Sequence, residues 1–172
     1  MTKLTRDDWI DAGLNALRAE GFTALKADLL AKRLRVTRGS FYGYFDGIEA
    51  YHDAIFAAWL ALSQDVAADM PQAGGPKAQL AHLITGAAGA DLALERAVRA
   101  WAQANPAIQH RLAEVDRYRT EALEAVLAAC GCSPAQARLR ARLLYASALG
   151  AAFVPGDVEA AEVAFLVAAY TQ

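Results

Sequence analysis

Hydrophobic residues recur along the chain with the three-and-four spacing of amphipathic helices. In the first such segment, predicted over 5–19, Trp9 and Leu17 fall on the same face. Thr5 precedes two acidic residues, and Gly21 follows the last periodic position. These are the usual signals for the start and the end of a helix, so the first segment is bounded on both sides.

The same spacing and end signals predict eight further helices, at 25–34, 38–45, 48–68, 77–88, 91–104, 106–129, 134–153 and from the N-cap Asp157 to about 170. In the helix at 25–34, the residues expected to face inward are Leu29, Leu30 and Leu34. The stretch MPQAGGP, residues 70–76, is the clearest linker. No segment has a strand pattern, so we predict an all-α fold of about nine helices.

The short helix predicted at 38–45 has an unusual exposed face. Phe41 and Phe45 are four residues apart and can both face the core, whereas the opposite arc carries Gly39, Ser40, Tyr42 and Gly43. Two glycines are poor helix formers, since each costs about 1 kcal/mol relative to alanine. A surface without side chains would let another molecule approach the backbone closely, and the hydroxyls beside it could form hydrogen bonds.

Composition supports a helical globular protein, because 56% of the 172 residues are hydrophobic and only 5 are proline. The formal net charge is −2, so no global basicity indicates a nucleic-acid partner. Local charge differs, since residues 23–45 carry a net charge of +4 from Lys26, Lys32, Arg33, Arg35 and Arg38 against Asp28. The basic charge therefore surrounds the unusual short helix.

Two helices joined by a short turn, with basic side chains around the second, are typical of a helix-turn-helix that binds the major groove of DNA. Lys26, Arg38 and Tyr42 are candidates for phosphate contacts, and Ser40 and Arg38 could reach base edges. The alternative is an ordinary helical pair whose basic face is merely solvated.

The segment from Gly21 to Ile55, GFTALKADLLAKRLRVTRGSFYGYFDGIEAYHDAI, resembles the N-terminal DNA-binding region of the TetR family of bacterial regulators. The family signature has a Gly-aromatic pair, a helix, a Val-Ser/Thr turn, a small residue before an aliphatic-Tyr pair, and His-Phe. The resemblance implies DNA contacts at Thr37, Arg38, Gly39, Ser40, Tyr42 and Tyr44, with Phe41 and Phe45 in the core. It also implies a DNA-binding domain at 1–46 and an effector-binding, dimerising domain at 47–172.

Several residues depart from the family pattern. Arg35 stands where the family has a turn glycine, so the turn is either unstrained or carries strain of about 1 kcal/mol. Tyr44 replaces the usual His, and Gly43 replaces a larger residue that often touches a phosphate. The usual Lys at the start of the fourth helix is missing, and the backbone of Gly47 and Ile48 could bind a phosphate instead.

The later helices are less informative about function. The segment LERAVRAWAQANP resembles a sub-group of TetR-like regulators, and its Glu95 and Arg99 are expected to form a surface pair contributing about 0.2–0.5 kcal/mol. We expect a small, mainly apolar effector to bind in the second domain and to act on the DNA-binding head through the helix 48–68. Candidate lining residues are Tyr51, Trp59, Leu62, Trp101 and Tyr118, although Trp101 is better suited to the core.

The last two helices are rich in alanine and glycine, which permits close helix packing. A monomer could bury their apolar stripe internally. The resemblance favours a two-fold homodimer, in which both DNA-binding heads address a palindromic operator. The expected interface residues are Leu139, Leu143, Ala146, Gly150, Phe153 and Phe165.

Other classes of protein have little support in the sequence. No catalytic or nucleotide-binding motif is present, so we expect neither an enzyme nor a cofactor. His52, His82 and His110 lack ligand spacing, and no metal is expected. Cys130 and Cys132 are interpreted as structural thiols, with redox sensing as the alternative.

No signal peptide or membrane span is predicted, so we expect a cytoplasmic protein without membrane contact. The favoured function is a TetR-type repressor that a small-molecule effector releases from DNA. The alternative is a helical enzyme or carrier with an incidental basic segment.

Overall fold

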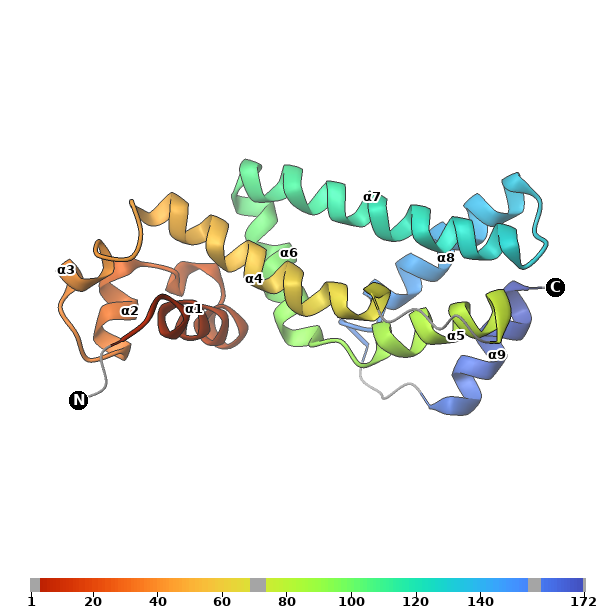
Figure 1. Cartoon of the computed structure of the whole chain (residues 1–172), viewed down its shortest axis with the longest axis horizontal. Coiled ribbons are helices and arrows are strands. Elements are labelled where there is room, and N and C mark those ends of the chain that lie inside the picture. Colours follow the sequence, from red (N-terminus) through yellow and green to blue (C-terminus); the bar gives the residue numbers. More distant parts are fainter. Residues whose placement is uncertain (1–3, 69–73, 155–158, 172) are drawn as a thin grey trace. The chain divides into compact units, whose positions relative to one another are not determined.

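The computed structural model describes residues 4–68, 74–154 and 159–171, and all regular structure in these residues is helical (Figure 1). In chain order the elements are α1 (Arg6–Glu20), the 3₁₀ helix η1 (Phe22–Ala24), α2 (Ala27–Arg33), α3 (Arg38–Phe41), α4 (Ile48–Ala68), α5 (Gly75–Ala88), α6 (Leu92–Ala104), α7 (Pro106–Ala129), α8 (Pro134–Gly150) and α9 (Ala160–Tyr170). Nine α-helices without a strand in the described residues confirm the predicted all-α class.

The helix ends are fixed by local hydrogen bonds. Thr5 Oγ1 accepts the backbone N–H of Asp8 at 3.2 Å, and the Asp8 carboxylate accepts the N–H of Thr5 at 2.6 Å, so α1 begins with a capping box. Asn105 Oδ1 accepts the N–H groups of Ala107 and Ile108 before α7. The predicted bounds of α4 and α7 agree with the observed ones, and for α7 the start is fixed by this local cap.

Several predicted details are wrong. The helix expected at 25–34 begins only at Ala27, as α2, after the separate 3₁₀ helix η1, and Leu29 is exposed instead of facing inward. The helix expected at 38–45 ends at Phe41 and continues as a turn. Helix α9 begins at Ala160 with Glu159 as its N-cap. The expected cap Asp157 and residues 70–73 of the predicted linker lie outside the described residues.

Contacts divide the chain into two compact units. Unit 1 comprises Met1–Ser63 and Ala93–His110, and unit 2 comprises Gln64–Leu92 and Arg111–Gln172. The predicted DNA-binding domain, 1–46, lies within unit 1. Unit 1 also contains the first part of α4 and nearly all of α6, so its packing extends beyond the helix-turn-helix.

The core of the head is a cluster of aromatic rings from α1, α3, the following turn and α4, which we call the aromatic cluster: Trp9, Phe41, Phe45 and Tyr51. The Phe41 ring centroid lies 5.4 Å from that of Trp9 and 5.2 Å from that of Tyr51, both edge to face. Tyr51 Oη donates to the Trp9 carbonyl at 2.7 Å. Burial raises the pKa of Tyr51, so its hydroxyl stays protonated and available as the donor.

A glycine allows α1 and α4 to pack this closely. A Cβ atom at Gly13 would lie 2.0 Å from Tyr51 Oη and 2.5 Å from Ile55 Cδ1. No side chain fits at that position without moving α4 or breaking the Tyr51 hydrogen bond. Gly13, which lies on the periodic face of α1, is therefore a close-approach residue.

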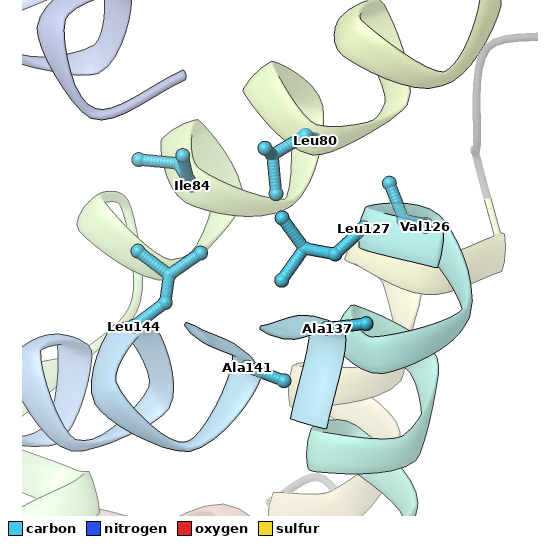
Figure 2. Close-up of a cluster of buried hydrophobic side chains, with 7 residues drawn as sticks. All are labelled: Leu80, Ile84, Val126, Leu127, Ala137, Ala141 and Leu144. Carbon is cyan, nitrogen blue, oxygen red and sulfur yellow. The ribbon is translucent and has the colours of Figure 1, made fainter. Parts of the chain in front are cut away.

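Unit 2 has its own apolar core between α5, α7 and α8, formed by Leu80, Ile84, Val126, Leu127, Ala137, Ala141 and Leu144. Figure 2 shows the side chains of Leu80 and Leu127 meeting between α5 and α7. Partly buried residues of α9 pack against this core. The Arg140 guanidinium of α8 donates to the carbonyl of Tyr170 at 2.7 Å and so ties α8 to the end of α9.

The two cysteines lie at the corner between α7 and α8 and are free and half-buried. Burial raises the pKa of Cys130, which favours its thiol form. Arg140 Nη1 lies 3.3 Å from Cys132 Sγ, and Cys132 packs against the core of unit 2. No helix of the described residues is both long and apolar enough to cross a membrane.

Candidate nucleic-acid interface

The turn between α2 and α3 has a defined hydrogen-bond pattern. The N–H of Arg35 donates to Lys32 O at 3.2 Å, and the N–H of Val36 donates to Ala31 O at 3.0 Å. These two bonds are those of a Schellman motif, with Leu34 as the C-cap of α2. The motif ends α2 and leads the chain into Thr37, the N-cap of α3.

A Schellman motif needs a left-handed residue directly after the C-cap, and glycine is usual there. Arg35 occupies that position with a φ of 56°, and it is the one non-glycine residue with positive φ in the described part of the chain. The structure therefore corresponds to the strained alternative for this turn. Its side chain is exposed.

The corner between α7 and α8 contains the same motif. The N–H of Gly131 donates to Ala128 O and that of Cys132 to Leu127 O, at 3.0 and 3.2 Å. Gly131 has a φ of 97° and holds the position that corresponds to Arg35. This chain thus builds one motif twice, with the unstrained residue in unit 2 and a strained arginine in the head.

Helix α3 separates a buried face from an exposed one. Phe41 is fully buried, whereas Tyr42 is 52% exposed and both Gly39 and Gly43 are exposed. A Cβ atom at Gly39 would meet nothing closer than Thr37 Oγ1, at 3.8 Å, and one at Gly43 would meet only Ser40 O, at 3.4 Å. Neither glycine has positive φ. The packing and the backbone conformation of the head therefore do not require these glycines.

The basic side chains of the head differ in their partners. Arg33 pairs with Glu20 at 2.5 Å, and Arg38 Nη2 donates to Tyr42 Oη at 3.2 Å. The second bond raises the pKa of Arg38, whose guanidinium is charged in any case. The side chains of Lys26, Lys32 and Arg35 form no hydrogen bond or ion pair with the described residues.

The remaining predicted DNA contacts have internal partners. Thr37 Oγ1 and Ser40 Oγ lie 3.2 Å apart at the start of α3. Tyr44 Oη donates to the Leu4 carbonyl at 2.5 Å and holds the segment before α1. Tyr44 thus has a clear structural role, and its contact with DNA stays a prediction.

The candidate effector residues fall into two groups. Tyr51, Trp59 and Trp101 are buried in unit 1, and Tyr51 belongs to the aromatic cluster. Leu62 and Tyr118 are 61% and 60% exposed. Four of these residues belong to unit 1 and Tyr118 belongs to unit 2, so a shared binding site also stays a prediction.

The Glu95–Arg99 pair is not on the surface, which corrects the prediction from its spacing. Glu95 is only 8% exposed, and Arg99 Nε donates to its Oε1 at 2.8 Å. Spacing within α6 showed that the two could pair, but burial depends on residues packed against α6, and spacing does not reveal those. Losing one partner of a buried pair costs about 3–5 kcal/mol, far more than a surface pair contributes.

His52 is a residue whose position the sequence did not indicate. Its Nε2 lies 3.2 Å from the carbonyl of Leu25, directly before α2, and its ring meets Trp101 of α6 edge to face at 5.2 Å. His52 therefore connects α4 both to the segment that leads into the helix-turn-helix and to α6. Its spacing within α4 gave no signal, because both partners are remote in sequence.

The geometry of α2, the turn and α3 defines a helix-turn-helix domain. Residues 10–54 match the model of the family described as bacterial regulatory proteins, tetR family. No curated protein matches the sequence. The N-terminal region therefore belongs to the TetR family, which confirms the resemblance carried by its motifs.

Solved structures extend the likeness over the whole fold. A transcriptional regulator from Rhodococcus sp. Rha1 is similar with a TM-score of 0.73 and 19% identity, over 98% of this chain and 94% of that chain. A TetR-like transcriptional regulator from Rhodococcus sp. RHA1 is similar with a TM-score of 0.72 and 16% identity, over 99% and 96%. At these identities the likeness establishes the fold.

The strain at Arg35 yields a pair of opposite stability predictions. Arg35→Gly should raise the free energy of unfolding by about 0.5–1 kcal/mol, because relief of about 1–2 kcal/mol of left-handed strain exceeds the entropy cost of glycine. Gly131→Arg should lower it by a similar amount, since its Cβ would meet no atom within 4 Å and only the backbone effect operates. Urea unfolding measures both. An unchanged or lower stability of Arg35→Gly would show that the turn is unstrained.

Proposed function

We propose that this protein is a homodimeric DNA-binding transcriptional repressor that a small molecule releases from its operator. The observation that carries DNA binding is the exposed face of α3, where glycine, serine and tyrosine residues lie beside cationic side chains. Two glycines in or directly after a short helix lower its stability without any benefit to packing. Close approach of the DNA backbone to this surface supplies a reason for them.

Each exposed group has a chemical role in this proposal. Arg38 and Tyr42 are held together by a hydrogen bond at 3.2 Å, so the pair presents a cation and a hydroxyl with little freedom to reorient. Such groups bind phosphate oxygens and position the protein on the duplex. Ser40, one helical turn from Thr37, is placed to reach base edges. Lys26, at the N-cap of α2, offers a further phosphate contact.

Substitutions on α3 should separate DNA binding from folding. Arg38→Ala and Tyr42→Ala should each weaken duplex binding at least about tenfold, because hydrogen bonds to charged groups contribute about 1.5–3 kcal/mol. Both side chains are exposed, so the free energy of unfolding should change by less than about 1 kcal/mol. Fluorescence anisotropy with labelled DNA and urea unfolding give the two readouts.

The control for this experiment is Phe41→Ala. Its fully buried ring should leave a cavity that costs about 3–5 kcal/mol of stability. Normal duplex binding by Tyr42→Ala would show that α3 is not the recognition helix. A wild-type protein without salt-dependent duplex binding would instead favour the enzyme or carrier alternative.

The dimer proposal is supported by large apolar side chains that the single chain leaves exposed on α8, the residues that follow it and α9, which we call the α8–α9 set. Its residues Leu139, Leu143, Phe153, Val154 and Phe165 are all more than half exposed in the single chain. Ala146 is exposed and Gly150 is half-buried on α8. Exposed apolar side chains in such number are typical of a protein–protein interface, and two-fold symmetry would pair them with the same residues of a second copy.

Gly150→Leu should weaken the dimer without unfolding the chain. A Cβ atom at Gly150 would meet nothing within 4 Å, so the single chain has room for a larger residue. A close-packed interface tolerates added volume poorly, and the cost should be about 1–3 kcal/mol. Sedimentation equilibrium measures the dimer, with Ala19→Leu on the exposed surface of α1 as the control. A wild-type monomer at micromolar concentration would refute the proposed dimer.

The effector proposal rests on the contacts of α4 in unit 1. His52 touches the segment before α2 and also Trp101 of α6, so a ligand that moves α6 could change the position of the helix-turn-helix. Trp59 and Trp101, with Tyr51, Leu62 and Tyr118, are the proposed residues that line or border the binding site. A ligand shifts DNA binding only through its different affinity for the two arrangements, typically by 1–3 kcal/mol.

Effector release should be reciprocal. An apolar metabolite that quenches tryptophan fluorescence should lower the affinity of the protein for operator DNA. Operator DNA should lower the affinity for that metabolite by the same factor. This coupling factor is measured by titrating DNA with and without the metabolite and the metabolite with and without DNA. His52→Ala should bring the coupling factor closer to one. A metabolite that binds tightly and leaves DNA affinity unchanged would refute coupling for that ligand.

A further inference from the structure

Arg35 combines two properties that call for an explanation beyond folding. It is a left-handed non-glycine residue, with a φ of 56°, and its side chain is exposed. The Gly131 motif shows that this chain can end a helix in the same way with an unstrained residue. A strained residue that the fold does not require points to a role for its side chain, since strain of this kind collects at functional sites.

The Arg35 guanidinium is available for an external partner. Nearby arginines are already engaged, because Arg33 pairs with Glu20 and Arg38 donates to Tyr42. Arg35 forms no side-chain hydrogen bond or ion pair with the residues that the structure describes. A basic residue after a helix also complements the helix dipole, but Lys32 and Arg33 already supply positive charge in the last turn of α2.

The position of Arg35 places that charge beside the recognition helix. It lies two residues before Thr37, so the two Cα atoms are no more than about 7 Å apart. The N-terminal end of a recognition helix is the end that approaches the bases, with the DNA backbone on both sides of the groove. An extended arginine side chain from this turn can therefore meet a backbone phosphate next to the groove.

We propose that Arg35 binds a DNA phosphate beside the recognition helix and that the left-handed turn residue is retained for this contact. The inference rests on the proposed DNA-binding function and adds a positioning residue to it. Arginine suits the role because its charge is permanent and its planar donors match phosphate oxygens. The contact holds the protein on the duplex without reading its sequence.

Three substitutions of Arg35 separate charge from backbone strain. Arg35→Asn removes the charge and keeps a residue that tolerates the left-handed conformation. Arg35→Gly removes the charge and the strain together, whereas Arg35→Lys keeps both. The matched control is Arg117→Asn, which removes the same charge from an exposed position on α7 in unit 2.

Full-length wild type and variants are titrated with two fluorescein-labelled duplexes of unrelated sequence, between about 50 and 200 mM salt. For Arg35→Asn and Arg35→Gly, the negative slope of log K against log salt should become shallower by about 0.9 for each bound chain. This change in slope corresponds to DNA binding about fivefold weaker than that of the wild type, per chain, near 0.15 M salt. Arg35→Lys and Arg117→Asn should retain the wild-type slope, and thermal melting confirms that each variant is folded.

Binding to both duplexes should be weakened by the same factor, because a phosphate contact carries no sequence information. A larger loss on one duplex would overturn the phosphate assignment, and so would an equal loss of slope in Arg35→Lys. If Arg35→Asn binds like wild type while Tyr42→Ala is impaired, the role of Arg35 is refuted and the proposed function stands. A wild-type protein that binds neither duplex at low salt overturns both.

Discussion

The packing of Phe41 against Trp9, Phe45 and Tyr51 is the constraint on which the DNA-binding head depends. Helix α3 has only four residues, and a helix of that length is not stable on its own, because nucleation costs more than one turn of hydrogen bonds returns. The aromatic cluster supplies the missing stability and fixes the direction in which α3 presents its other residues. The glycines on the exposed side are tolerated because the buried side already holds the helix in place.

The same cluster connects the recognition helix to the rest of unit 1. Tyr51 belongs to α4, donates to the Trp9 carbonyl of α1 and touches Phe41 of α3, and Gly13 allows this close approach. One residue further along α4, His52 contacts Leu25 and Trp101. Two adjacent residues of one helix thus contact α1, α3, the segment before α2, and α6. A displacement of α4 would change all of these contacts together, which is why the coupling proposal centres on this helix.

Much of the fold and part of the site were predictable from the sequence, because the signals concerned are local. Caps at Thr5 and Asn105 fixed helix starts, and the spacing of Phe41 and Phe45 identified the buried side of α3. The failures concern properties that remote residues decide. Leu29 satisfied the helical spacing yet lies exposed, and Glu95 was expected on the surface yet is buried. Neither the early end of α3 nor the two contacts of His52 had a signal in the nearby sequence.

The turn before α3 shows how stability and function can oppose each other at one residue. Hydrogen bonding alone dictates the left-handed conformation, since the N–H groups of Arg35 and Val36 both return to the last turn of α2. It does not dictate the side chain, and the corner at Gly131 meets the same demand with glycine. The head has a stable aromatic core next to this turn, so it can absorb strain of about 1 kcal/mol without losing the fold. Because the aromatic core is stable, the head can keep a strained, charged residue where the recognition helix begins.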